Sequence, residues 1–206
     1  MDFAVNILAL GIPFSVALLL ASLGEMFNQR AGVFNLGCEG IMAMGAFLGM
    51  LVPYGAGHGA PVPGTFNVLG LLLAMAVGAL LGLLFGLAVV TFRAPQGIAG
   101  IGLQMFGVGT AGTLFRHFVG GTQSVPGIDR LPIPVLSDIP FIGPVLFSHN
   151  PLVYLTFLLV PAAWYILFRT PWGLRVRASG ANPRAADSVG IRVNLVRFQA
   201  LAVGGA

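Results

Sequence analysis

The stretch FNVLGLLLAMAVGALLGLLFGLAVVTF, residues 66–92, decides the fold class of this chain, because it contains neither a charged residue nor a proline. A helix needs about 20 apolar residues to cross the ~30 Å hydrocarbon core of a bilayer. At ~1.5 Å per residue this stretch would reach about 40 Å, so it should tilt or project beyond the hydrocarbon. It therefore predicts a membrane-spanning helix.

Other parts of the chain also contain long runs without a charged residue. Charged residues are absent from 3–24, from 94–115 and from 139–168, and the charge-free interval around the first stretch covers the whole of 40–92. We expect spans at about 4–23, 35–52, 66–92, 97–115 and 151–168, and a sixth that begins near Asn194. The predicted fold class is all-α: a polytopic transmembrane helical bundle of about six spans, forming a single domain over 1–206.

The composition agrees with a membrane protein and excludes several chemistries. Only 8 % of the 206 residues are charged, against roughly 25 % in soluble domains. All ten basic residues are arginine, so a P-loop lysine and a Schiff-base lysine are both excluded. Cys38 is the only cysteine, which excludes an internal disulfide. We expect no catalytic residues, no metal, no cofactor and no nucleic-acid partner.

The arginines predict an orientation. If 24–34 is cytoplasmic, alternation of the spans places eight arginines inside, against two outside, Arg116 and Arg130. Cytoplasmic loops carry the excess of Lys and Arg. The inside set is Arg30, Arg93, Arg169, Arg175, Arg177, Arg184, Arg192 and Arg197. The outer connections are then 53–65 and 116–150, and we expect a short re-entrant or surface-lying piece near 139–147.

Small residues mark where helices should touch. Gly70, Ala74, Gly78, Gly82 and Gly86 recur every four residues along the third predicted span. In lipid, close backbone approach at small residues is a main source of helix association. The stripe therefore predicts packing against neighbouring helices and says little about transport.

A short capped helix is predicted within the cytoplasmic loop 170–193. Asn182 is suited to an N-cap, Pro183 to the first helical position and Gly190 to the end of the helix. Two turns are too few for an isolated helix, so this one must pack on something. Its small apolar face, formed by Ala185, Ala186 and Val189, is expected to be exposed. The segment is either a docking site for a soluble partner or an ordinary basic loop.

Polar residues also occur where spans are predicted. Asn35 and Glu39 lie among glycines that loosen the start of the second span, and a carboxylate at membrane depth suggests function. The alternative is a structural role at the membrane edge, near a helix N-terminus. In the fourth span Gln104, followed by Met105 and Phe106, could face a solute path or bond to another helix. The pathway candidates are Asn35, Gly37, Glu39, Gly40, Gln104 and Phe106.

Three segments carry a family resemblance. Residues 24–46, GEMFNQRAGVFNLGCEGIMAMGA, resemble the G-E-x(6)-G-V-x-N-x-G-x-E-G segment of nucleoside-type permeases of ABC importers, in the branch that serves simple sugars, nucleosides and branched-chain amino acids. The run LSDIPFIGPVLF at 136–147 is similar to their outer loop, and RTPWGLR at 169–175 is similar to the stretch before their coupling helix. The resemblance covers essentially the whole chain. It ends within an apparent helix, where the family continues, so we expect a C-terminally incomplete fragment.

The resemblance implies a permease subunit of an ATP-driven importer that moves a nucleoside or simple sugar across a bacterial inner or plasma membrane. Its implied partners are ABC ATPase subunits, a second permease subunit (identical or homologous), an extracytoplasmic substrate-binding protein and membrane lipid. The coupling loop 170–193 would contact the ATPase. The residues it assigns to coupling are Gly173, Leu174, Arg175, Arg177, Gly180, Asn182, Pro183, Ala185, Ala186 and Gly190.

Two other functions are open at this point. An ATPase-independent secondary transporter or channel should carry ionisable residues deep in its spans for ion coupling, and only Glu25 and Glu39 qualify. An intramembrane enzyme needs a nucleophile or metal constellation inside the bundle. The three histidines instead fall in loops or at the ends of spans.

Overall fold

A computed structural model describes residues 2–56, 64–120 and 148–206 of the chain. The long charge-free stretch forms helix α3 (Gly64–Gly86), which continues as the π-helical turn η1 (Leu87–Thr91). Together they supply an apolar helix over Phe66–Thr91 that is long enough to cross a membrane. The prediction of one long span is confirmed; it ends at Thr91, with Phe92 as the C-cap, and is followed by Arg93, whose backbone has φ 56°.

The other long helices agree with the predicted spans. They are α1 (Asp2–Arg30), α2 (Cys38–Ala56), α4 (Gln96–Phe118) and α6 (Pro151–Arg169). With α3 they make five helices in the described part of the chain that are long and apolar enough to span a bilayer. The expected sixth span corresponds to α9 (Val193–Gly205), whose 13 residues are fewer than the about 20 that one crossing needs.

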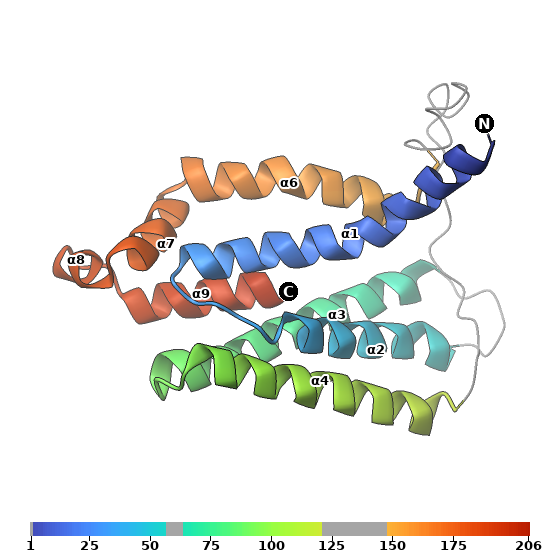
Figure 1. The fold of residues 1–206 in the computed structure, drawn as a ribbon, viewed down its shortest axis with the longest axis horizontal. Coiled ribbons are helices and arrows are strands. Elements are labelled where there is room, and N and C mark those ends of the chain that lie inside the picture. Colours follow the sequence, from blue (N-terminus) through green and yellow to red (C-terminus); the bar gives the residue numbers. More distant parts are fainter. Residues whose placement is uncertain (1, 57–63, 121–147) are drawn as a thin grey trace.

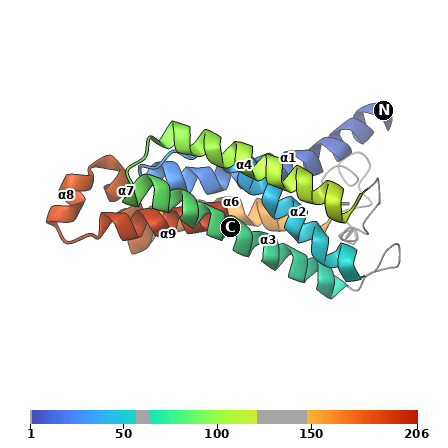
Figure 2. The ribbon, with the colours of Figure 1, turned by 90° about the horizontal axis from the view of Figure 1, so that it is seen from below.

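The helices run side by side along one axis (Figure 1). α2 packs on both α3 and α4, α9 packs between α1 and α3, and α6 packs on α1. Figure 2 shows the same bundle from below, with α9 lying alongside α3. The described residues contain helices and no strand, so the predicted all-α bundle is confirmed.

The small-residue stripe of α3 meets two different neighbours. A Cβ on Gly70 would meet the carbonyl oxygen of Gly49 in α2, and a Cβ on Gly82 would meet that of Leu201 in α9. Gly78 approaches the backbone of Gly205 in the same way. The stripe therefore fixes α3 against α2 along one half and against α9 along the other, as close helix packing in lipid requires.

The connection between α1 and α2, predicted at 24–34, has different boundaries in the structure. α1 remains helical to Arg30, so the non-helical part is only 31–37 and α2 begins at Cys38. The polar residues near the end of α1 do not stop the helix, because the amides of Asn28 and Gln29 both donate to the Glu25 carboxylate one turn earlier. Their side-chain NH2 groups are therefore satisfied within the helix itself, whereas the Oδ1 of Asn28 is buried without a hydrogen-bond partner.

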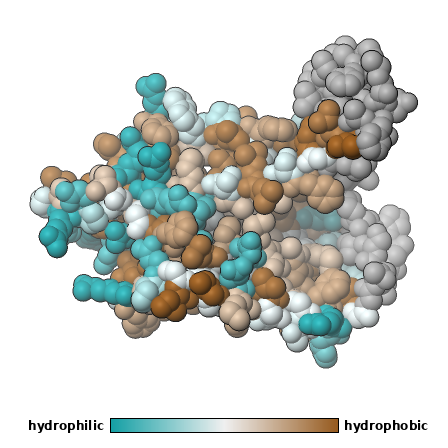
Figure 3. Space-filling model, viewed as in Figure 1, coloured by the Kyte–Doolittle hydropathy of each residue, from teal (hydrophilic) through white to brown (hydrophobic). Residues whose placement is uncertain are grey.

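The two ends of the bundle differ in charge. The C-terminal ends of α1 and α6, the turn between α3 and α4, and the short helices α7 (Pro171–Ala181) and α8 (Pro183–Ser188) meet at one end. We call it the arginine-rich end, because it holds the eight arginines predicted to lie inside. Figure 3 shows hydrophilic residues gathering toward this end. Large apolar side chains such as Phe14, Leu18 and Leu158 are more than 60 % exposed along the helices, as lipid contact requires.

Most of the predicted outer connections, including the piece expected near 139–147 and Arg130, lies outside the described residues.

Candidate functional site

The loop 170–193 is built from two capped helices. Asn182 caps α8 by accepting a hydrogen bond from the amide of Ala185 at 3.1 Å, and Pro183 follows at the first helical position. Gly190, with φ 85°, ends this segment in the left-handed region. The predicted short helix is therefore confirmed.

Helix α7 was not expected, although the sequence carries a signal for it. Thr170 accepts a hydrogen bond from the amide of Gly173 at 3.1 Å, and Pro171 stands at the first helical position. The pair Thr170-Pro171 is thus the same cap-and-proline start as Asn182-Pro183.

Helix α7 is packed tightly onto the membrane helices. Gly173 lies against the carbonyls of Ile166 and Leu167 in α6, and Gly180 lies against the carbonyl of Arg30 in α1. Between these contacts Val176 is completely buried. Gly173 and Gly180, both predicted coupling residues, therefore fix the position of α7 and leave Leu174 and Arg175 exposed on its outer side.

The predicted exposed face of α8 is wrong at one residue. Ala186 is only 4 % exposed. The reason is that α8 packs against both α7 and α9. At its end the chain reverses at Gly190, and the amide of Ile191 donates to the Ala186 carbonyl at 3.0 Å. The apolar surface that α8 does present consists of Ala185, which is exposed, and Val189, which is 76 % exposed.

A positively charged cavity of about 460 Å³ lies beside α8. Three arginines and one aspartate supply its charges. Its lining is Pro183, Arg184, Asp187, Arg192, Val193, Asn194 and Arg197. The arginine-rich end therefore offers both an apolar contact and a basic hollow to a partner.

The 31–37 connection joins this region to the interior of the bundle. Near its start the Nε of Arg197 in α9 donates to the carbonyl of Ala31 at 3.2 Å. Gly32, with φ 80°, lies against the Cα of Gly180 in α7, so the left-handed backbone and the close approach both require glycine here. The start of the connection is thus fixed by α7 and α9 together.

The far end of the 31–37 connection is held by side chains of α1 and α4. The amide of Phe34 donates to the Gln96 side chain at 2.8 Å, and the amide of Asn35 donates to the Glu25 carboxylate at 3.0 Å. Asn35 is buried, and its own side chain accepts from the amide of Gly37 at 2.8 Å. Backbone groups without helical partners are satisfied in this way, as burial demands.

Glu39 and Gln104 form a polar pair between α2 and α4. The Gln104 amide donates to the Glu39 carboxylate, and Glu39 is otherwise exposed. α2 begins well inside the bundle, away from the arginine-rich end where α4 starts (Figures 1 and 2). Gln104 lies eight positions into α4, or about 12 Å from that end at ~1.5 Å per residue. The pair therefore lies at membrane depth.

The structure brings five of the six pathway candidates together and separates the sixth. Gly40 touches the backbone of Gln104 and of Gly107, and Gly37 touches Leu103. These glycines make the α2–α4 crossing possible and so place Glu39 beside Gln104. Phe106 does not share a face of α4 with Gln104, because residues two apart on a helix point in directions about 160° apart; its place in the pathway stays a prediction. Phe106 lies exposed on another side of α4.

The sequence did not predict the contacts made by four residues: Glu25, Asn28, Gln96 and Arg197. A signal existed for part of this set, because Glu25, Asn28 and Gln29 have the i, i+3, i+4 spacing of side chains that meet on one helix face. The contacts of Gln96 and Arg197 join residues 62 and 166 positions apart, and no local pattern carries that information.

Comparison with known proteins identifies the family. The family model described as the permease component of a branched-chain amino acid transport system matches residues 6–206. The guanosine ABC transporter permease protein NupQ of Bacillus subtilis (strain 168) is 37 % identical over 218 residues, which cover 98 % of this chain and 65 % of that protein. No solved structure matches this chain.

Two further relatives are also named as ABC transporter permease proteins. The nucleoside ABC transporter permease protein NupC of Lactococcus lactis subsp. cremoris (strain MG1363) is 33 % identical over 199 residues, 93 % of this chain and 61 % of that protein. The putative glucose ABC transporter permease protein TsgC13 of Haloferax volcanii is 32 % identical over 209 residues, 100 % of this chain and 60 % of that protein. The chain spans less than two thirds of the length of each of these relatives. It is a multi-pass membrane protein that belongs to the family of permease components of branched-chain amino acid transport systems.

Proposed function

We propose that this chain is the membrane-spanning permease subunit of an ATP-driven importer for a nucleoside or a simple sugar. Its partners would be ABC ATPase subunits, a second permease subunit and an extracytoplasmic binding protein. The observation that carries the proposal is the 31–37 connection, which is held by α7 and α9 at one end and reaches the Glu39–Gln104 pair at the other.

In this proposal α8 is the contact for the ATPase. A six-residue helix cannot hold its own shape, and α8 is supported by its Asn182 cap and by the burial of Ala186. That support leaves Ala185 and Val189 outward as a shallow apolar surface, beside the basic cavity. Such a combination suits a groove on a soluble partner that has apolar walls and an acidic rim.

Motion of α8 would pass to the membrane helices through α7. Gly180 lies against the Arg30 carbonyl and the Gly32 amide with no room for a Cβ. Close-packed contacts of this kind transmit a displacement, since a packed interior has little compressibility. A shift of α7 would therefore move the start of the 31–37 connection, and with it Asn35 and the beginning of α2.

The Glu39–Gln104 pair is the proposed polar element of the translocation pathway. A charged side chain at the centre of a membrane helix costs about 2.5–3.5 kcal/mol on insertion scales. Glu39 is exposed on the isolated chain, so we place its open side toward a water-filled path, which the second permease subunit would help to enclose. A carboxylate and an amide there can hydrogen-bond the hydroxyls of a sugar or ribose.

The names of three relatives support the proposed substrate class. The three proteins named above carry guanosine, nucleoside and glucose in their names, and these solutes share a ring with several hydroxyl groups. One polar pair offers few hydrogen bonds, so selection in this proposal belongs mainly to the binding protein. Guanosine and glucose are accordingly the two probes to compare.

The experiment is a steric block on α8. Replacing Ala185 by Trp should lower guanosine or glucose uptake by about tenfold or more and reduce co-purification with the ATPase, because bulk at a fitted contact costs about 1–3 kcal/mol. Ala185→Ser, which keeps the size, should behave like the parent. Ala186→Trp should instead lower folded yield, because that residue is buried. Uptake at the parental rate in folded Ala185→Trp would remove the docking role and favour an ATPase-independent transporter or channel.

A further inference from the structure

Two arginines from different helices share one aromatic ring at the arginine-rich end. The Cζ of Arg177 in α7 lies 5.0 Å from the ring centre of Phe168 in α6, and the Cζ of Arg30 in α1 lies 5.8 Å from the same centre. Each guanidinium is within the range in which a cation is attracted to a ring. Three helices thus contribute to one small cluster, which we call the Arg30–Phe168–Arg177 cluster.

No described carboxylate neutralises this cluster. Within 2–56, 64–120 and 148–206, neither guanidinium forms an ion pair or a hydrogen bond, and the Nε of Arg177 is buried without a partner. Glu25 lies on the same helix as Arg30, but its oxygens already accept from Asn28, Gln29 and Asn35. Two like charges that share one ring repel each other, and each guanidinium has five N–H donors to satisfy. The cluster therefore suits an anion.

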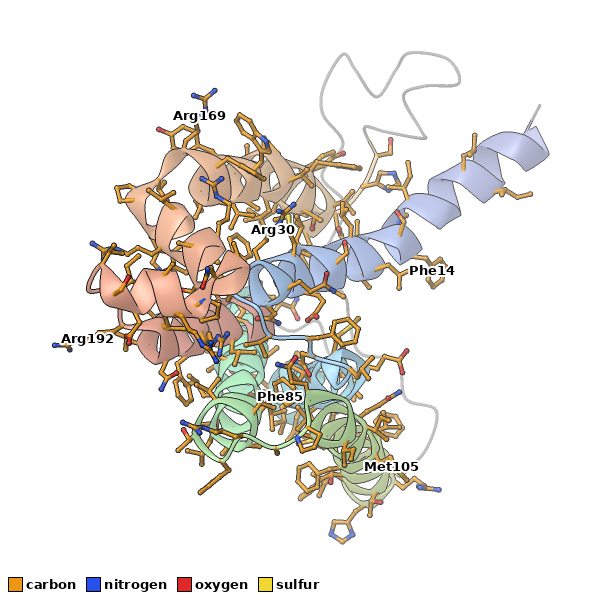
Figure 4. The ribbon with its side chains drawn as sticks, turned by 60° about the vertical axis from the view of Figure 1, so that its left-hand side comes forward. Phe14, Arg30, Phe85, Met105, Arg169 and Arg192 are labelled. Carbon is orange, nitrogen blue, oxygen red and sulfur yellow. The ribbon has the colours of Figure 1, made fainter. Side chains whose placement is uncertain are left out.

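Its surroundings place the cluster at the depth of lipid headgroups. Trp164 and Tyr165, one turn before Phe168, are 51 % and 59 % exposed, and the Cζ of Arg169 lies 5.7 Å from the Trp164 ring centre. Exposed Trp and Tyr are typical of the membrane–water interface. Figure 4 shows Arg30 between α1 and α6, with Arg169 projecting away from the bundle.

We propose that the Arg30–Phe168–Arg177 cluster binds the phosphodiester headgroup of an anionic phospholipid. The guanidinium group of arginine can donate two parallel hydrogen bonds to phosphate oxygens. Basic pockets between membrane helices on the cytoplasmic side are suited to anionic headgroups. A lipid is favoured over free phosphate because the apolar outer face of α6 continues from the cluster. Leu158, which is 66 % exposed on that face, offers a surface for an acyl chain.

A bound headgroup would join α1 to α7 by an ionic bridge. Gly180 already brings α7 onto the end of α1, and the phosphodiester would hold the two helices together at a second point. This inference does not depend on the proposed transport function, because the site consists only of residues at the membrane surface.

The tryptophans of the chain can report lipid bound near the cluster through fluorescence quenching. Its two tryptophans, Trp164 and Trp172, stand four positions before and after Phe168, and the ring centres of Trp164 and Phe168 are 6.1 Å apart. The protein is reconstituted in phosphatidylcholine vesicles in which a fixed fraction of lipid is brominated on its acyl chains. Tryptophan quenching is then compared between brominated phosphatidylglycerol and brominated phosphatidylcholine.

We expect stronger quenching by phosphatidylglycerol. Each basic residue near a membrane surface contributes about fivefold to the binding of anionic lipid, so Arg30→Gln and Arg177→Gln should each lower the preference by about fivefold. Arg93→Gln changes the same charge at the same end, in the turn between α3 and α4, and should retain the parental preference. Elution as a single species in gel filtration confirms that each variant is folded.

Three results would overturn the proposal. Equal quenching by the two lipids would show that no anionic headgroup is selected. An unchanged preference in folded Arg177→Gln would place the selection elsewhere. Loss of the preference in millimolar inorganic phosphate, at ionic strength held constant with chloride, would show that the cluster takes free phosphate in place of a lipid.

Discussion

Glu25 and Glu39 stand on either side of the 31–37 connection, and the structure treats them differently. Glu25 accepts hydrogen bonds from the side chains of Asn28 and Gln29 and from the amide of Asn35. Glu39 accepts one, from Gln104, and is exposed. The two carboxylates thus differ: one holds the backbone of the connection, and the other is exposed, with oxygen lone pairs left to accept further hydrogen bonds.

The same contrast appears in the packing of the helices. Around Glu25 the bundle is closed, since the backbones of α1, α3 and α9 touch at Gly24, Gly82 and Gly204. On the outward side of α4, Gly102 and Gly109 have nothing within 4 Å of an added Cβ. We call these the closed side and the open side. A side chain added on the closed side must displace a helix, whereas one added on the open side meets only lipid or a partner.

The largest effect is expected from bulk on the closed side. Gly82→Leu would place a side chain on the Leu201 carbonyl of α9, and overpacking costs about 1–3 kcal/mol or more when backbones must separate. Folded yield, measured as the monodisperse fraction in gel filtration, should fall severalfold. Gly109→Leu is the matched change on the open side and should keep the parental yield. Similar losses in both variants would mean that the two sides do not differ in packing.

A smaller effect separates the two carboxylates. Glu25→Ala leaves the Asn28 amide and the Asn35 backbone amide without their acceptor, at about 1–3 kcal/mol for a buried unsatisfied group. Glu39→Ala removes one hydrogen bond between membrane helices, a contact worth about 0.6 kcal/mol on average. Thermal unfolding in detergent should therefore show a clear loss of stability for Glu25→Ala and little change for Glu39→Ala. An equal loss in both would remove the structural distinction between them.

Much of the fold could be predicted from the sequence, because membrane spans are defined by long uncharged runs. The α3 stripe and the Asn182 cap were predictable for the same reason, since each is a local pattern with a fixed period or spacing. Ala186 was misplaced because its burial depends on the packing of α8 against α7 and α9, which the pattern within α8 does not contain.

The candidate site was harder to predict than the spans. Asn35 and Glu39 could be selected, because polar residues are rare in apolar segments. Their partners could not, since the contacts of Gln96 with Phe34 and of Gln104 with Glu39 join α4 to residues more than 60 positions earlier. The packing of the whole bundle decides which carboxylate oxygens accept hydrogen bonds from the protein and which remain exposed.

The most direct test asks whether position 39 meets water and responds to the ATPase. In a Cys38→Ser background, which removes the only native cysteine, Glu39→Cys is compared with Leu158→Cys on the exposed face of α6. A membrane-impermeant thiol reagent is added with and without a nonhydrolysable ATP analogue, in membranes that contain the ATPase. We predict that position 39 reacts, that position 158 does not, and that the nucleotide changes the rate at 39 severalfold. The account would be contradicted if Glu39→Cys reacted as slowly as Leu158→Cys. It would also be contradicted if the nucleotide left the reaction rate at position 39 unchanged.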